Sequence, residues 1–179
     1  PLIWTLVLGL KESASTFFSI DEGVDSGHIV SQRFFVVNPD DNARSLYDKI
    51  VDFAKIQIIE IMNQLKHGAL SRKPQDLSAG NIWRRRTYED GQIDWRMSAS
   101  MVCNLVRGLS EPYCGAHFRY CGSDIKVNSC KILNISNLEN REPGFIVKVL
   151  PEGNLIIKCG SGCVEIEPIR PLRGVKPGG

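Results

Sequence analysis

The stretch SIDEGVDSGHIVSQ, residues 19–32, crowds three carboxylates into a turn that contains glycines. Asp21, Glu22 and Asp25 lie within five residues of one another, and His28 follows Asp25 closely. A partly buried carboxylate can orient a histidine and stabilise its charged form, as general acid–base catalysis requires. The simpler interpretation is a capped turn, because Asp and Gly are common turn residues and Asp accepts hydrogen bonds from nearby backbone N–H groups. The residue types alone allow both interpretations.

Burial of the last carboxylate would favour the catalytic interpretation. Val24 and Ile29 stand on either side of Asp25, and these apolar neighbours predict that its carboxylate is partly buried. His28 is a candidate partner only because it is close in sequence. A single histidine beside a strand is more often structural, so no catalytic role is assigned to it.

The elements around this turn should position it. Ser15–Ile20 and His28–Val37 are β-prone runs, which predicts a strand–loop–strand unit with the acids at its tip. A long helix is expected over residues 38–68, capped by Asn38 or Asp40, and it should cover the sheet. The apolar residues at helical spacing, expected to be core, are Leu46, Ile50, Phe53, Ile61 and Leu65.

The second half of the chain predicts one helix followed by short strands. A polar, irregular stretch at residues 69–92 is interpreted as a linker. The next helix should be capped by Ser98 or Asp94. Its expected apolar face is Met101, Val102, Leu105, Val106 and Leu109. The β-prone runs are AHFRYCG, DIKVNSCKILNIS, PGFIVKVLPEG, NLIIKCGSG and CVEIEPIRP. Five short strands separated by turn signals fit a small β-barrel.

Composition places the chain among soluble globular proteins. Of the 179 residues, 42% are hydrophobic and 23% are charged, which provides ample material for a core. No apolar run is long enough to span a bilayer, and the first residues lack the features of a signal peptide, so a cytoplasmic location is expected. Residues 1–80 hold 8 Lys/Arg and 10 Asp/Glu (8 − 10 = −2), whereas residues 81–179 hold 14 and 10 (14 − 10 = +4). The positive net charge of residues 81–179 favours a partner that carries phosphate groups.

The chain has six cysteines, and buried free thiols are the expected state of all of them. Cys159 and Cys163 bracket the sequence GSG and could face each other across a hairpin. A zinc site would require two close pairs, and only this pair is close in sequence, so no metal is expected.

The opening segment, PLIWTLVLGLKESASTFFSIDEGVDSGHIVSQ, resembles the second half of the catalytic domain of the 10-formyltetrahydrofolate-dependent formyltransferases. In that family a Pro-led helix precedes a strand and a D-x-G-x-D-x-G loop, which here is Asp21, Gly23, Asp25 and Gly27. RRRTYEDGQIDW and NLVRGLSEPYCGAHF match two further segments of the family, DG-x-IDW and an arginine followed by P-x-x-GA. The resemblance covers nearly the whole chain, although the barrel strands match only in pattern.

The resemblance implies an α/β fold class with two domains. Residues 1–70 would be the C-terminal part of a Rossmann-like formyltransferase domain. The residues themselves predict a helix over residues 1–9, because proline is favoured in the first turn of a helix and Gly9 would end it. Residues 71–92 would be a linker. Residues 93–179 would form a helix and a small OB-like β-barrel domain.

By the same resemblance, Asp25 is the catalytic aspartate and 10-formyltetrahydrofolate is the co-substrate. The residues that would line the pterin pocket are Asp21, Glu22, Gly23, Val24 and Asp25. Closely spaced glycines suit this role, because they let backbone groups approach a flat heterocycle and pair with its edge.

The implied reaction is attack of a substrate amine on the formyl carbon, through an oxyanion that needs a hydrogen-bond donor. In the family an Asn-x-His pair upstream of the Pro-led helix stabilises the oxyanion and moves protons, while the aspartate orients the histidine. His28, His67 and His117 do not occupy that position. This chain alone is therefore expected to be inactive.

The substrate remains open between two branches of the family. WRRRTYEDGQIDWRMSA and EPYCGA favour an amino-sugar nucleotide, and the alternative is the initiator tRNA of a methionyl-tRNA formyltransferase. Arg84, Arg85 and Arg86 could pair with a diphosphate or form a solvated basic linker. A third interpretation is a non-catalytic binding or assembly module. The sequence also leaves open whether the barrel binds substrate or forms a homodimer.

Overall fold

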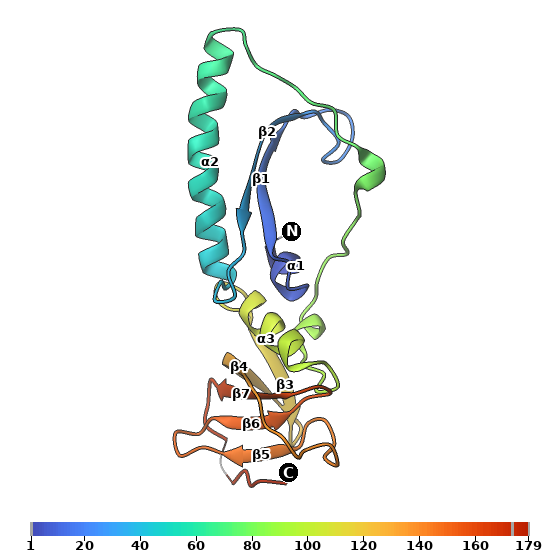
Figure 1. Cartoon of the computed structure of the whole chain (residues 1–179), viewed down its shortest axis with the longest axis vertical. Coiled ribbons are helices and arrows are strands. Elements are labelled where there is room, and N and C mark those ends of the chain that lie inside the picture. Colours follow the sequence, from blue (N-terminus) through green and yellow to red (C-terminus); the bar gives the residue numbers. More distant parts are fainter. Residues whose placement is uncertain (1, 173, 179) are drawn as a thin grey trace. The chain divides into compact units, whose positions relative to one another are not determined.

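The computed structural model of the chain describes residues 2–172 and 174–178, and it contains both helices and sheets (Figure 1). The helices are α1 (Leu2–Val7), α2 (Ala43–Lys66) and α3 (Ala99–Gly108), with 3-10 turns η1 (Leu77–Ala79) and η2 (Glu89–Gly91). The strands are β1 (Glu12–Phe18), β2 (Ile29–Val36), β3 (Ala116–Tyr120), β4 (Ser123–Leu133), β5 (Ile146–Val149), β6 (Leu155–Lys158) and β7 (Cys163–Pro168). The mixed α/β class predicted from the sequence is confirmed. Within the described residues, none of the helices combines the length and the apolar content needed to cross a bilayer.

The internal contacts of the chain define two compact units. Unit 1 comprises the described residues of Pro1–Gly9, Asp41–Arg44 and Arg86–Gly179. Unit 2 comprises Leu10–Asp40 and Ser45–Arg85. Neither unit is continuous in sequence, and the predicted domain divisions after residues 70 and 92 stay a prediction.

Unit 2 is built from the β1–β2 hairpin and α2, which run beside each other (Figure 1). The two strands are antiparallel, from the Glu12↔Val36 pair near one end to Phe18↔Ile29 at the other. Stacking between Phe35 and Phe53, whose ring centroids are 5.3 Å apart, packs α2 against the hairpin. The predicted strand–loop–strand unit and its covering helix are therefore present.

A buried glutamine also ties α2 to the hairpin. Gln57 is fully buried, and its Nε2 donates to the Ser15 carbonyl at 3.2 Å and to Ser31 Oγ at 2.8 Å. One side chain thereby bridges the helix to both strands. β1 begins at Glu12, earlier than the predicted start at Ser15. The prediction followed the aromatic run, whereas pairing with β2 also recruits the polar residues before it.

The start of α2 lies later than the sequence prediction. The Val37 N–H donates to the Lys11 carbonyl at 2.8 Å, so the chain is still held beside β1 at that point. The helix begins at Ala43, and Asn42 Oδ1 accepts a hydrogen bond from the Arg44 N–H at 3.0 Å. Asn38 and Asp40 therefore lie too far before the first residue of the helix to cap it. They belong to the connection between β2 and α2.

The apolar stripe of α2 is only partly core. Leu46 is fully buried, but Leu65 near the end of the helix is 49% exposed. The large apolar side chains of α2 that are exposed within unit 2 are Tyr47, Ile56, Ile58, Ile59, Met62 and Leu65. Ile50, Phe53 and Ile61 are half-buried, so the prediction that the whole stripe is core is correct for Leu46 and wrong for the rest of the stripe. A hairpin of two strands offers too little apolar surface to cover a helix this long.

Unit 1 contains a five-stranded antiparallel sheet with the order β3-β4-β7-β6-β5. The first part of β4 pairs with β3, and the part from Val127 to Leu133 pairs with β7. A register shift between Val127 and Ser129 lies where the partner changes. All five predicted strands are present. The predicted hairpin at GSG closes, with the Cys159 N–H donating to the Gly162 carbonyl, and the turn between β5 and β6 closes in the same way, with the Leu150 N–H donating to the Asn154 carbonyl.

Helix α3 packs on this sheet through its apolar face. Ser98 is its cap, since Ser98 Oγ accepts a hydrogen bond from the Met101 N–H at 3.2 Å. The buried residues of the helix are Ala99, Val102, Leu105, Val106 and Gly108. Met101 is half exposed, so its assignment to the apolar face is wrong. The helix also contacts α1, where a side chain on Gly108 would press against Leu6 and Val7.

Candidate functional site

The acidic loop between β1 and β2 is folded by its first aspartate. Asp21 Oδ1 accepts hydrogen bonds from the Gly23 N–H at 3.0 Å and from Ser26 Oγ at 2.7 Å. This is the local backbone capping that favours Asp in turns. Asp21 therefore shapes the loop, as the simpler interpretation of the sequence predicts.

Glycine is required at the end of the loop. Gly27 is buried, and a β-carbon at this position would lie 1.7 Å from the Ser19 carbonyl oxygen, so any other residue would force the two segments apart. Beside this contact the Ser19 N–H donates to the His28 carbonyl at 2.9 Å. The two ends of the loop are thus closed against each other.

Asp25 lies on the exposed part of the loop in a left-handed backbone conformation, with φ 55°. The expected partial burial of its carboxylate is wrong. Val24 is 93% exposed and does not cover it. Within the described residues the structure shows no hydrogen bond or ion pair between the Asp25 carboxylate and His28. Left-handed non-glycine residues cost free energy and cluster at functional sites. The loop thus presents Asp25 with its carboxylate accessible.

A glutamine distant in sequence fixes the backbone beneath Asp25. Gln75 Nε2 donates to the Asp25 carbonyl at 2.9 Å and to the Gly27 carbonyl at 2.6 Å. Lys73, two residues earlier, exchanges backbone hydrogen bonds of 2.7 and 2.8 Å with Ile29. Part of the predicted linker therefore pairs with β2. No local pattern marks Gln75, because its role exists only once residues about fifty positions apart come together.

A cavity of about 630 Å³ lies beside the loop. Its lining residues are Ser19, Ile20, Asp21, Gly27, His28 and Arg72. Of the predicted pterin-lining residues only Asp21 is among them, and Glu22, Gly23, Val24 and Asp25 occupy the exposed loop tip. Arg72, which was not predicted as a site residue, adds a cation to the lining. The cavity therefore offers both a carboxylate and a guanidinium to a polar ligand.

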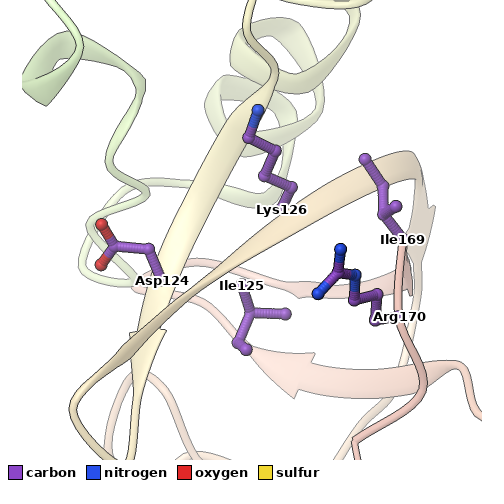
Figure 2. A pocket seen from close by; sticks show the side chains of 5 residues that line it. All are labelled: Asp124, Ile125, Lys126, Ile169 and Arg170. Atoms are coloured by element: carbon purple, nitrogen blue, oxygen red, sulfur yellow. The ribbon is translucent and has the colours of Figure 1, made fainter.

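Unit 1 holds a second cavity, of about 420 Å³, lined by Asp124, Ile125, Lys126, Ile169 and Arg170 (Figure 2). In Figure 2 the Asp124 carboxylate points away from the two cations. It lies 3.6 Å from the guanidinium of Arg119 and accepts a 3.3 Å hydrogen bond from Tyr88. Within the described residues no salt bridge occupies Lys126 or Arg170. The pair could therefore hold an anionic group.

Arg86 and Trp95 of unit 1 each contact an aromatic ring. The Arg86 guanidinium lies 5.1 Å from the centre of the Trp4 ring and donates to the Asp90 carbonyl at 2.8 Å. Trp95 packs edge-on against Phe118, with ring centroids 5.5 Å apart. Arg86 and Trp95 thus both contribute to packing within unit 1.

The cysteines divide by burial. Cys159 and Cys163 are buried, and burial together with the neighbouring Cys163 raises the pKa of Cys159 to about 12. Cys114 and Cys121 are exposed, so the expectation that all six thiols are buried is wrong. Both thiols lie outside the apolar core. At these positions the neighbouring turn residues predict exposure better than the hydrophobicity of cysteine predicts burial. In the described part of the chain, His, Cys, Asp and Glu form no group of three that could hold a metal.

Comparison with known proteins assigns the family. The family model described as "Formyl transferase, C-terminal domain" matches residues 85–176, about half of the chain. The chain belongs to the formyltransferase family. This confirms the resemblance predicted from its motifs, and with it membership of a family of enzymes.

Two relatives of this formyltransferase chain are named methionyl-tRNA formyltransferase. The protein of Caldanaerobacter subterraneus is 31% identical over 95% of this chain and 53% of its own length. The protein of Geobacter metallireducens is 32% identical over 98% of this chain and 54% of its own length. The chain thus spans about half the length of the relatives it matches.

A solved structure shares the fold. The N-formyltransferase from Helicobacter canadensis, crystallised with folinic acid and dTDP-3-aminofucose, superimposes with a TM-score of 0.70 at 18% identity. The likeness covers 93% of this chain and 59% of the other. At this identity the match supports the arrangement of the elements alone.

Proposed function

We propose that the full-length protein transfers a formyl group from 10-formyltetrahydrofolate to a primary amine. The observation that carries this proposal is the Asp25 loop in a chain of the formyltransferase family. An accessible carboxylate stands on a backbone held by Asp21, Gly27 and Gln75. Under this proposal, unit 2 includes the end of a Rossmann-like catalytic domain and the sheet of unit 1 is an OB-like barrel.

The role proposed for Asp25 is to orient a histidine. A carboxylate hydrogen-bonded to an imidazole fixes its tautomer and stabilises its protonated form. The histidine would come from the Asn-x-His pair of the family, which this chain does not contain. Asp21, Glu22, Gly23 and Val24 would line the pterin with backbone N–H and C=O groups, since no side chain in this stretch is apolar and buried.

The first candidate for the amine is the methionyl group of initiator tRNA. Support comes from the 31–32% identity to relatives named methionyl-tRNA formyltransferase. A tRNA presents phosphates, and Lys126 and Arg170 in the unit 1 cavity provide cations that could bind one.

The second candidate is an amino-sugar nucleotide. The observation that favours it is the sequence around DG-x-IDW and EPYCGA, which resembles the sugar branch of the family. Its diphosphate would use the same kind of cationic contact.

An assay of the full-length protein with labelled 10-formyltetrahydrofolate tests the function. Charged initiator tRNA and a panel of amino-sugar nucleotides would be offered separately. We expect formyl transfer to the tRNA, whereas transfer only to a sugar would favour the second candidate. Failure with every amine would refute the formyltransferase proposal. Residues 1–179 alone should give no turnover, and measurable turnover would contradict the role given to the absent histidine.

The substitutions Lys126→Gln and Arg170→Gln test the tRNA candidate further. For tRNA, each should weaken binding and reduce its salt dependence, because a phosphate contact would be lost. Lys131→Gln, an exposed cation on the same strand but outside the cavity, is the matched control. Equal effects of all three substitutions would indicate that the cavity has no special role.

A further inference from the structure

Two thiols of unit 1 lie close together. Cys103 on α3 and Cys130 on β4 have their sulfur atoms 2.6 Å apart. A disulfide bond is about 2.05 Å long, so little movement separates this contact from a covalent bond. The two positions are 27 residues apart in sequence, and the packing of α3 on the sheet brings them together. In the sequence, by contrast, the close pair is Cys159 and Cys163.

Access distinguishes this pair from the other cysteines. Cys103 and Cys130 are half-buried, so a small oxidant can reach them. Cys159 and Cys163 are buried, and burial raises the pKa of both thiols, which disfavours reaction. Cys114 and Cys121 are exposed, but no second thiol is recorded in contact with either within the described residues.

We propose that Cys103 and Cys130 form a dithiol modification site, which a peroxide converts to an intramolecular disulfide. The inference goes beyond formyl transfer and does not depend on it. In the first step the Cys103 thiolate attacks a peroxide oxygen, the O–O bond breaks, and Cys103 sulfenic acid and hydroxide result. In the second step the Cys130 sulfur attacks the sulfenic sulfur and the sulfenic oxygen leaves as water. The two thiols lose two electrons and two protons, and hydrogen peroxide is reduced to two waters.

The surroundings assign the first step to Cys103. The hydrogen bond from the Cys130 thiol lowers the pKa of Cys103, burial opposes this, and the Arg107 charge lowers it further. The pKa of Cys130 is raised, first by the same hydrogen bond and then by burial. Because the thiolate is the nucleophile, Cys103 attacks and Cys130 resolves.

The bond would tie α3 to the sheet. Closing a loop of this length restricts the unfolded chain, so the oxidised form should unfold at a higher temperature by roughly 10 °C. A dithiol reductant should reverse the change, because thiol–disulfide exchange returns both sulfurs to thiols.

Peptide mapping of the intact chain tests the proposal. The reduced chain is treated with equimolar hydrogen peroxide, remaining thiols are alkylated, and the products are digested with trypsin. We expect Met97–Arg107 to be linked to Val127–Lys131, with a mass lower than the sum of the two peptides by two hydrogen atoms. A link from Cys103 to any other cysteine, or oxidation of Cys114 and Cys121 with no Cys103–Cys130 link, would overturn the proposal.

Single substitutions give an independent readout. Cys103→Ser and Cys130→Ser should each abolish the rise in unfolding temperature on oxidation. Cys121→Ser, at an exposed thiol outside the pair, should leave the rise unchanged. The wild-type peptide map remains decisive if either serine variant fails to fold. An undiminished rise in both serine variants would contradict the assignment.

Discussion

The two units of the chain bury their apolar side chains to different degrees. In unit 1, α3 and five strands enclose a core in which Val102, Leu155 and Val164 are almost completely buried. In unit 2, one helix and two strands leave much apolar surface in contact with water. Phe34 on β2 is 68% exposed and Ile59 on α2 is 63% exposed. Apolar burial is thus the main source of stability for unit 1, and a smaller one for unit 2.

The candidate site belongs to the unit with the smaller core. Its order comes from specific polar contacts instead. Gln57 joins α2 to both strands, Gln75 holds the loop carbonyls, and Asp21 folds the loop tip. Hydrogen bonds of this kind fix geometry at modest net free energy. The site loop should therefore be sensitive to single polar substitutions, whereas unit 1 should be sensitive to loss of core volume.

The largest effect is expected from truncating the same residue type in the two units. Ile157→Ala removes a side chain that is 1% exposed and should destabilise unit 1 by about 3–4 kcal/mol, because it leaves a cavity. Ile59→Ala on α2 should change stability by less than about 0.5 kcal/mol, since the side chain is exposed and Ala favours helices. Urea unfolding followed by tryptophan fluorescence and by circular dichroism measures both losses of stability. Equal losses would contradict the difference between the two cores.

The next effect concerns the polar bridge of unit 2. Gln57→Met keeps the size of the side chain but removes two hydrogen bonds and leaves the Ser15 carbonyl buried without that donor. We expect a loss of about 1–3 kcal/mol, seen as faster hydrogen exchange in β1 and β2. Gln64→Met, on an exposed position of the same helix, should have almost no effect. Unchanged exchange in the Gln57 variant would show that the bridge is dispensable.

A smaller effect is expected at the start of α3. Ser98→Ala removes the side-chain oxygen that accepts from the Met101 N–H and should cost about 1 kcal/mol of unit 1 stability. Ser98→Asp should recover most of it, because aspartate also caps helices. If both variants lose the same stability, the contribution of Ser98 is not capping.

The smallest effect is an acid-dependent one at the surface of unit 1. The hydrogen bond from the Arg96 side chain, and then that from its backbone N–H, lowers the pKa of Asp94 from 3.8 to about 2. Because the folded pKa is depressed, the stabilisation is complete above about pH 4 and is lost as the pH falls towards 2. Thermal unfolding of wild type and Asp94→Asn should therefore differ slightly at neutral pH and converge near pH 2. A difference that grows on acidification would have the wrong sign.

The sequence predicts unit 1 better than unit 2 for a physical reason. Each strand of unit 1 is a short β-prone run between turn residues, and the Ser98 cap is a local signal. Such features depend on neighbours along the chain. The acidic loop was found in the same way, from residue types at close spacing.

What the sequence could not predict depends on tertiary contacts. The exposure of Leu65 depends on how far the hairpin reaches along α2. The role of Gln75 and the contact between Cys103 and Cys130 join segments that are distant in sequence. The burial of Asp25 was predicted wrongly because apolar neighbours in sequence, such as Val24, can point into solvent.

The central claim is that Asp25 on this loop serves formyl transfer, and one kinetic measurement tests it most directly. In the full-length protein Asp25→Asn keeps the shape of the side chain and removes its charge. Glu12→Gln, at an exposed carboxylate on β1 outside the loop, is the control. We predict that kcat of Asp25→Asn falls by about 10²–10⁴-fold, while KM for the folate changes little and the control stays near wild type. A wild-type kcat in Asp25→Asn, or an equal loss in Glu12→Gln, would contradict the account.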